Sequence, residues 1–219
     1  VIENFKRFHP KPEAVQCSDP QEEPEFIKPH FGLRLFPVWH VGTDYLHEIG
    51  KNWYQYLVDN GVEFVWETKV TEIDFDNQEL YCDWNTPKET IEYDRLIFGV
   101  GKSGIDFGKK LAEKYELATE PKSVQIGVRF EAPQKHFQKL IDISYDFKLY
   151  RKYDSKGVSL RSFCTNNNAA YVAAEHTYGD YSYNGHAKKD EAYRNDMTNF
   201  GILMEIKNID KPFDWSRDA

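Results

Sequence analysis

Three features of the sequence carry residue types that could do chemistry: a glycine turn, an arginine and a cysteine. The glycine turn spans residues 99–104 (GVGKSG) and follows the apolar run of residues 96–98. Ligands of α/β sheets collect where strands end, and glycine there lets the backbone approach a ligand because no Cβ intervenes. The turn is therefore the first place to expect a cofactor, although a strand-to-helix turn can use glycine for its geometry alone.

Arg129 lies in residues 123–131, where apolar and polar residues alternate more cleanly than anywhere else in the chain. This alternation predicts a strand that carries Arg129 and Glu131 on the same face. If that face borders a cleft, the guanidinium could hold an anionic group. The alternative is an ordinary charged pair on a solvated sheet face.

Cys164 could act as a nucleophile or a redox thiol, or it could be a half-buried strand residue that packs and does nothing else. The other cysteines, Cys17 and Cys82, lie far from it in sequence. The three have no partners at metal-ligand spacing, so neither a disulfide framework nor a metal site is predicted.

The sequence has no dinucleotide fingerprint near the N-terminus and none of the common triphosphate-binding, metalloprotease or hydrolase motifs. No G-x-G-x-x-G follows a strand near the N-terminus, and G-x-x-x-x-G-K-[ST], H-E-x-x-H and G-x-S-x-G do not occur. His40, His176 and His186 are far apart, so their spacing assigns none of them as a general base.

The composition restricts the class of protein. The chain has 219 residues, a formal net charge of -8 and 40% apolar residues, which fits a folded globular protein. The acidic balance argues against general nucleic-acid binding. No apolar run reaches the ~20 residues of a membrane-spanning helix, and the first residues given lack the apolar core typical of a signal peptide. We therefore expect a soluble cytoplasmic protein that binds neither nucleic acid nor membrane, and the sequence does not indicate its oligomeric state.

These chemical groups need elements to position them, and the periodicities predict an α/β or α+β fold. Residues 1–30 are rich in proline and predict an extended arm. Within residues 31–120 we expect a helix at 45–60, strand character from Val62, a β-meander, a buried strand at 96–100 and a helix at 105–115. Residues 121–206 predict a β-rich domain with a long loop at 180–193, and residues 207–219 predict a tail.

Six spaced motifs resemble a family of FAD-dependent dehydrogenases, often described as NAD(FAD)-utilising dehydrogenases. The similarity extends over about residues 31–206, and the motifs occur in the order found in that family. They are HVGTDYL at 40–46, GVEF at 61–64, LIFGVGKSGID at 96–106, GVRFEAPQ at 127–134, SFC at 162–164 and NG at 184–185.

The resemblance implies an incomplete FAD-binding domain of Rossmann type with an inserted, mixed β-rich substrate domain. The glycine fingerprint that receives the FAD pyrophosphate in such proteins would precede Val1. The resemblance assigns Val70 to a backbone contact with adenine, and Gly99, Gly101 and Lys102 to the second turn beside the cofactor. Residues 127–131 would begin the substrate part that faces the flavin, and NAD(P)H could be the electron partner.

The chain departs from the family at two motifs. Relatives have a histidine-serine-alanine-arginine type sequence where this chain has KSGI at 102–105. They also have Cys-x-Cys followed by Pro-Gly-Gly where it has CTNNNA at 164–169, so a dithiol is not available there.

Two functional hypotheses follow. In the first, the chain is a fragment of an FAD-dependent oxidoreductase that acts on a small-molecule substrate, with Arg129 and Cys164 as the candidate catalytic residues. In the second, it is a non-catalytic binding or structural module that contacts a protein partner.

Overall fold

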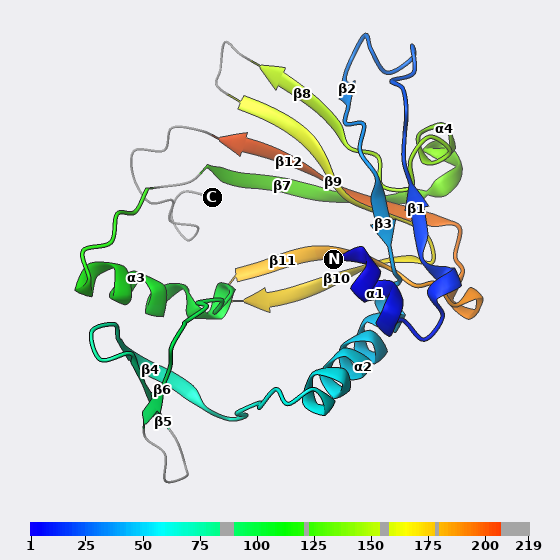
Figure 1. Ribbon diagram of the computed structural model, residues 1–219. Helices are drawn as coiled ribbons and strands as arrows, with labels where there is room; N and C mark the ends of the chain where they lie inside the picture. The colour runs from blue at the N-terminus through cyan, green and yellow to red at the C-terminus, as the bar shows by residue number, and fades with distance from the viewer. Residues whose placement is uncertain (84–89, 121–122, 154–157, 178–179, 207–219) are drawn as a thin grey trace. The chain divides into compact units, whose positions relative to one another are not determined.

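A computed structural model describes residues 1–83, 90–120, 123–153, 158–177 and 180–206. These residues form mostly antiparallel sheets with few helices, so the fold class is α+β (Figure 1). The chain divides into two compact units: unit 1 comprises Val1–Leu57 and Pro121–Ala219, and unit 2 is Val58–Glu120. Residues 31–57 therefore group with the β-rich part of the chain, whereas we expected them in the FAD-binding part.

Unit 1 is built on a five-stranded antiparallel sheet of order β2-β8-β9-β12-β7. The alternation at residues 123–131 correctly predicted β7, and its register places Phe130 opposite Phe200 of β12. The strands are β2 (Gly32–Leu33), β7 (Val124–Pro133), β8 (Leu149–Tyr153), β9 (Val158–Asn168) and β12 (Met197–Ile206).

A second antiparallel pair in unit 1 joins β10 (Ala170–Thr177) to β11 (Asp180–Ala187). The long loop expected at residues 180–193 is therefore wrong in its first part. Its second part contains a short 3-10 turn at Glu191–Tyr193. Residues 180–187 form a strand because their backbone pairs with β10. Tyrosine favours a strand even where no period-two pattern is visible.

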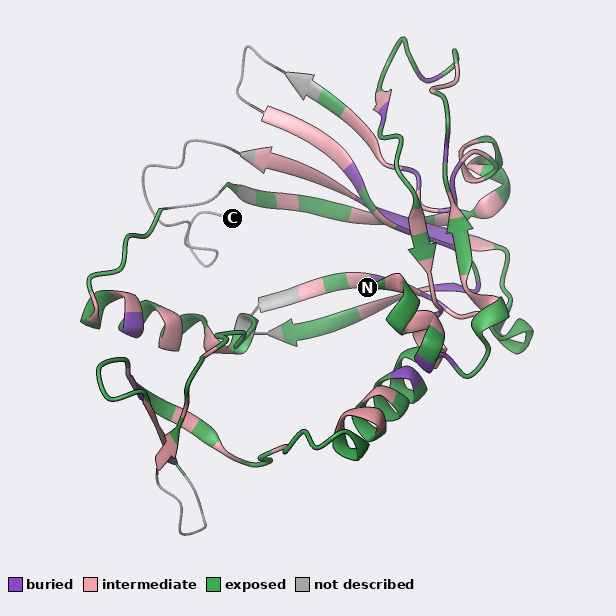
Figure 2. Cartoon of the chain, in the orientation of Figure 1, coloured by how far each residue is buried: buried purple, intermediate pink, exposed green. Residues whose placement is uncertain are grey.

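Figure 2 shows buried residues on the inner strands of the sheet, and a separate apolar cluster forms its hydrophobic core. Ile27, Leu33, Phe147 and Phe200 form the buried cluster. The Phe200 ring centroid lies 5.1 Å from that of Phe137 and 5.4 Å from that of Phe147, both in edge-on contacts. Each such ring contributes roughly 1.5–3 kcal/mol by burial. A short helix, α4 (Gln138–Ile141), preceded by a 3-10 turn at Gln134–His136, covers the cluster.

The N-terminal residues are folded, which corrects the prediction of an extended arm at residues 1–30. Helix α1 (Ile2–Phe8) is followed by a 3-10 turn at Pro12–Ala14 and by β1 (Gln16–Ser18), which pairs with β3 (Val38–His40). The Phe8 ring stacks on Trp53 of α2 (Leu46–Asp59) at a centroid distance of 5.5 Å. Aromatic burial thus outweighs the prolines, which lie mainly between the elements.

Asp44, in the 3-10 turn Thr43–Tyr45 before α2, joins this region to the end of the chain. Its carboxylate accepts hydrogen bonds from the backbone N–H of Lys189 at 3.0 Å and of Asp190 at 3.0 Å. These groups are 145 and 146 residues away in sequence. Asp44 therefore makes a long-range contact between two distant parts of the chain. The helix predicted at residues 45–60 is confirmed as α2.

Unit 2 contains the predicted meander and a helix. The meander is β4 (Lys69–Asp74), β5 (Glu79–Asp83) and β6 (Thr90–Glu92), and the 3-10 turn Lys102–Gly104 leads into α3 (Ile105–Lys114). Tyr115, directly after α3, donates a hydrogen bond of 2.5 Å to the carbonyl of Ile73. That contact and the burial of Ile73, which is 1% exposed, attach the helix end to the meander.

Two strands expected in unit 2 are not formed. Residues 62–67 and 96–100 belong to no sheet in the described part of the chain, and Ile97 is 94% exposed. The apolar runs predicted strands, but a strand requires a neighbour to accept and donate its backbone hydrogen bonds. None of the helices formed by the described residues has the length and apolar character needed to cross a membrane.

Candidate functional site

The structure brings the two candidate catalytic residues together across the sheet of unit 1. Arg129 is on β7 and Cys164 on β9, and β12 runs between these strands. Asn199 of β12 lies opposite Glu131 on one side and Asn166 on the other. We call Arg129, Cys164, Asn166, Gly185 and Asn199 the polar cluster.

The Arg129 guanidinium is held by three protein oxygens. Its Nε donates to the carbonyl of Tyr183 at 3.0 Å, and its Nη1 donates to the carbonyl of Cys164 at 3.0 Å and to Oδ1 of Asn199 at 2.8 Å. Hydrogen bonds from a charged donor are stronger than neutral ones. Arg129 therefore joins β7, β9, β11 and β12 to one another, and its bond to the Cys164 carbonyl positions the Cys164 backbone.

Two buried asparagines complete this arrangement. The Asn166 amide donates to the Cys164 carbonyl at 2.9 Å and to Oδ1 of Asn199 at 3.2 Å, and the Asn199 amide donates to the carbonyl of Tyr171 at 3.1 Å. Asn166 is 4% exposed and Asn199 is 0% exposed. Burial of amides costs little here because each finds hydrogen-bond partners.

Gly185 of β11 allows the hairpin to approach the cluster. A Cβ at this position would lie 2.2 Å from Nη1 of Arg129, 2.2 Å from Oδ1 of Asn199 and 2.3 Å from Nδ2 of Asn166. Glycine is therefore required by close approach, since any side chain would displace the hydrogen-bonded groups. This explains the glycine of the NG motif at 184–185.

Cys164 has an unusual backbone conformation. The register between β9 and β12 shifts between Asn199 and Gly201, so β9 carries a bulge beside Phe163, and Cys164 has φ +47°. The left-handed region costs a non-glycine residue roughly 1–2 kcal/mol, which the surrounding hydrogen bonds must offset. Such strain occurs at functional sites.

The thiol of Cys164 is half-buried and has polar neighbours. Its Sγ lies 3.6 Å from the carbonyl of Gly185, to which it can donate, and 3.6 Å from Nδ2 of Asn166. Neither neighbour is a general base. The arrangement therefore orients a thiol, and a nucleophilic role would require a proton acceptor from the substrate or from solvent.

A second set of buried polar residues, Tyr145, Asn167 and Thr198, lies beside the cluster. Asn167 donates through its amide to the carbonyl of Tyr145 at 2.6 Å, and Thr198 donates to the carbonyl of Asn166 at 2.9 Å. Burial raises the pKa of Tyr145 to about 12. Sequence reasoning missed Asn166 and Asn167, because three consecutive asparagines are typical of a loop, and it missed Asn199 because no motif includes that residue.

His40 of β3 packs on this second group, with its ring centroid 4.7 Å from that of Tyr145. Burial, and to a smaller extent the positive charge of Lys189, lowers the pKa of His40 to about 4, while Asp146 and Asp44 act in the opposite direction. His40 is therefore neutral at pH 7. Its Nδ1 is buried and has no hydrogen-bond partner among the described residues.

The residues that the family resemblance assigns to FAD all lie in unit 2. Val70 is half-buried on β4 opposite Cys82, and Lys102 begins the turn before α3. Gly99 and Gly101 are exposed, a Cβ on either would meet nothing within 4 Å, and Gly101 has φ +63°. An open glycine turn before a helix fits a dinucleotide phosphate.

The sheet required for a Rossmann-type site does not accompany this turn. Residues 96–100, which should form its central strand, are outside the sheets of the described residues. The described residues therefore do not complete a Rossmann-type site at this turn.

The chain matches no protein-family model, and no curated protein matches its sequence.

Proposed function

We propose that this chain supplies the substrate-side part, and a portion of a Rossmann-type FAD-binding part, of a cytoplasmic FAD-dependent oxidoreductase. The observation that supports the proposal is the hydrogen bond of 3.0 Å from Arg129 to the Cys164 carbonyl, which joins two residues selected independently from the sequence. FAD would supply the hydride chemistry, and NAD(P)H would be the electron partner. The substrate would be a small molecule.

In this proposal Arg129 is a positioning residue for Cys164. Its described hydrogen bonds go to two backbone carbonyls and one asparagine, so its charge fixes the bulge of β9. The half-buried thiol of Cys164 would then face the substrate. Gly99, Gly101 and Lys102 would lie along the FAD phosphates, and Val70 would contact the adenine through its backbone.

The direct test is the visible absorption spectrum of the purified protein in its natural full length. We expect the bands of oxidised flavin, and colourless protein that does not bind added FAD would overturn the proposal. In a flavin-containing protein, Cys164→Ser should lower turnover, whereas Cys17→Ser, which changes an exposed cysteine, should not.

The positioning role of Arg129 has its own measurement. Arg129→Ala should lower turnover by changing kcat more than KM, because the thiol loses its orientation while substrate contacts are kept. Arg129→Lys should restore part of the loss. Equal turnover in all three proteins, together with an unchanged flavin potential, would contradict the role.

A non-catalytic binding module is the second candidate, and one observation favours it. The guanidinium of Arg129 donates to main-chain and amide oxygens within the sheet, which is a sufficient structural reason for its presence. The full-length protein would then be colourless, and its role would be to contact a protein partner.

A further inference from the structure

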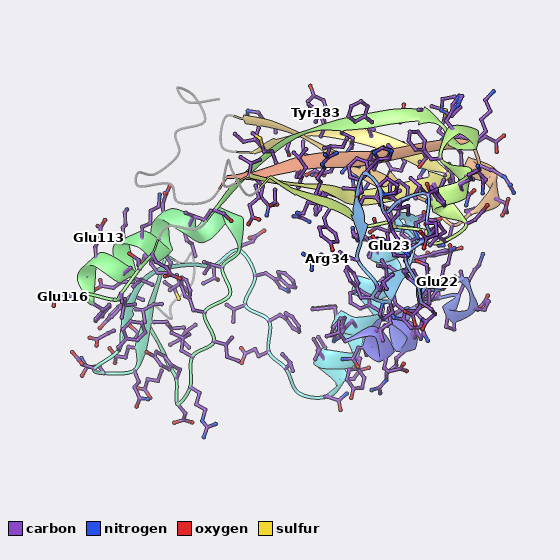
Figure 3. All side chains as sticks on the ribbon, turned by 90° about the horizontal axis from the view of Figure 1, so that it is seen from above. Glu22, Glu23, Arg34, Glu113, Glu116 and Tyr183 are labelled. Carbon is purple, nitrogen blue, oxygen red and sulfur yellow. The ribbon has the colours of Figure 1, made fainter. Side chains whose placement is uncertain are left out.

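Strand β7 is a long edge of the unit 1 sheet. It pairs with β12 on one side, and in the sheet order it has no strand on the other side among the described residues. β7 has 10 residues, and Figure 3 shows it along the outer margin of the sheet. An edge of this length presents alternate backbone N–H and carbonyl groups that another strand can pair with.

The side chains of β7 do little to protect this edge. Val128 is 61% exposed and Phe130 is 49% exposed, although both are apolar and lie on the face that continues the core cluster. Lysine, proline and inward charges are the usual protection of an edge strand. Arg129 is instead held in the polar cluster, and Pro133 occupies only the last position of the strand.

The sequence of β7 is complementary to itself in an antiparallel pair. In a pair related by a two-fold axis at Val128, Val128 faces its own copy and Ile126 faces Phe130. On the other face, Gln125 lies opposite Glu131 and Gly127 lies opposite Arg129. This register places apolar residues opposite apolar residues and brings no like charges together. An axis at Arg129 would place two arginines opposite each other, which is unfavourable.

We propose that β7 is a dimerisation strand, at which two copies of this chain pair antiparallel about a two-fold axis at Val128. Two unit 1 sheets then become one continuous sheet, and the exposed Val128 and Phe130 side chains are covered by the partner copy. The proposal does not depend on a flavin, and it holds for either function discussed above.

The first experiment is sedimentation of the purified protein over a range of concentrations. We expect a dimer, and Val128→Lys should raise the dimer dissociation constant on the order of tenfold or more, because two lysines would face each other at the axis. Leu35→Lys is the matched control, since Leu35 is an exposed apolar residue of unit 1 outside the edge, 47% exposed. A monomeric wild-type protein, or a Val128→Lys variant that dimerises as the wild type does, would overturn the proposal.

Cross-linking tests the register. In a Cys17→Ser background, which removes the exposed native thiol, Val128→Cys should form a disulfide-linked dimer on mild oxidation because the axis places the two positions opposite each other. Leu35→Cys in the same background should remain monomeric under denaturing conditions. Equal cross-linking of the two variants would show that β7 does not pair in this register. Circular dichroism of each variant confirms that the fold is kept.

Discussion

The polar cluster of unit 1 and the glycine turn of unit 2 both contain residues selected from sequence motifs, but they differ in burial and in hydrogen bonding. Hydrogen bonds of the cluster join five strands, β7, β9, β10, β11 and β12, and its asparagines are buried. The segment before the glycine turn is extended and exposed, with Ile97 at 94% and Phe98 at 46%. Backbone hydrogen bonds within a complete sheet therefore fix the positions of the cluster residues. An apolar run with no neighbouring strand to pair with does not form a strand.

The largest expected difference between the two regions comes from adding one methyl group to a glycine in each. Gly185→Ala should lower the free energy of unfolding by about 4 kcal/mol, because its Cβ would displace Arg129 and both asparagines and leave them without partners. Gly99→Ala, where a Cβ meets nothing within 4 Å, is the control and should be near neutral. Urea unfolding measures the change in free energy for both variants. Equal changes would contradict the difference in packing between the cluster and the glycine turn.

Acid should destabilise the region beside the cluster through His40. The folded pKa of His40 is about 4 and its ordinary value is 6.5, so the unfolded chain binds a proton first as the pH falls. The contribution of neutral His40 to the free energy of unfolding is therefore fully present above pH ~6.5. It decreases as the pH falls towards ~4, by about 3 kcal/mol in total.

His40→Phe provides the control for the acid effect, since it keeps a ring beside Tyr145 and removes the titrating group. The difference in free energy of unfolding between wild type and variant should change across this pH window. A difference that is independent of pH would contradict the buried neutral state of His40.

Arg129→Ala should cost about 2 kcal/mol of unfolding free energy, because two carbonyls and the Asn199 side chain lose a charged donor. Arg95→Ala changes an exposed arginine near the glycine turn and should stay within about 0.5 kcal/mol. Thermal unfolding of both variants checks this, and similar midpoints would mean that the cluster is not supported by Arg129.

The smallest effect is expected at the exposed run before the glycine turn. Ile97→Ser should change the free energy of unfolding by less than about 0.5 kcal/mol, because the side chain is almost fully exposed. Ile73→Ala, at a residue that is 1% exposed in the same unit, should cost about 2–4 kcal/mol. A large loss at Ile97 would show that residues 96–100 are packed in solution.

The fold was predictable from the sequence where periodicity is local. The apolar spacing of residues 45–60 gave α2, the alternation of residues 123–131 gave β7, and the meander followed from short strands between turns. The N-terminal arm was mistaken because Phe8 is buried by Trp53, a contact across 45 residues that no local pattern contains.

The candidate site was predictable only in part. Arg129 and Cys164 are 35 residues apart in sequence. They come into hydrogen-bonding distance only because β12 pairs with both of their strands. Asn166 lies in a run of three asparagines that is typical of a turn, and it is buried because β9 continues past its bulge and pairs with Asn199 of β12. Sequence reasoning therefore identified the charged and reactive groups but not the neutral amides that hold them.

The link from Asp44 to residues 189 and 190 bears on the order in which the chain acquires its structure during synthesis. Unit 2 is one continuous segment, so its contacts are available as soon as residue 120 has been made. Unit 1 must wait, because the partners of Asp44 and the inner strand β12 are made after the whole of unit 2. Residues 1–57 are therefore made well before the strands on which they pack, and this delay leaves their apolar side chains open to aggregation during synthesis.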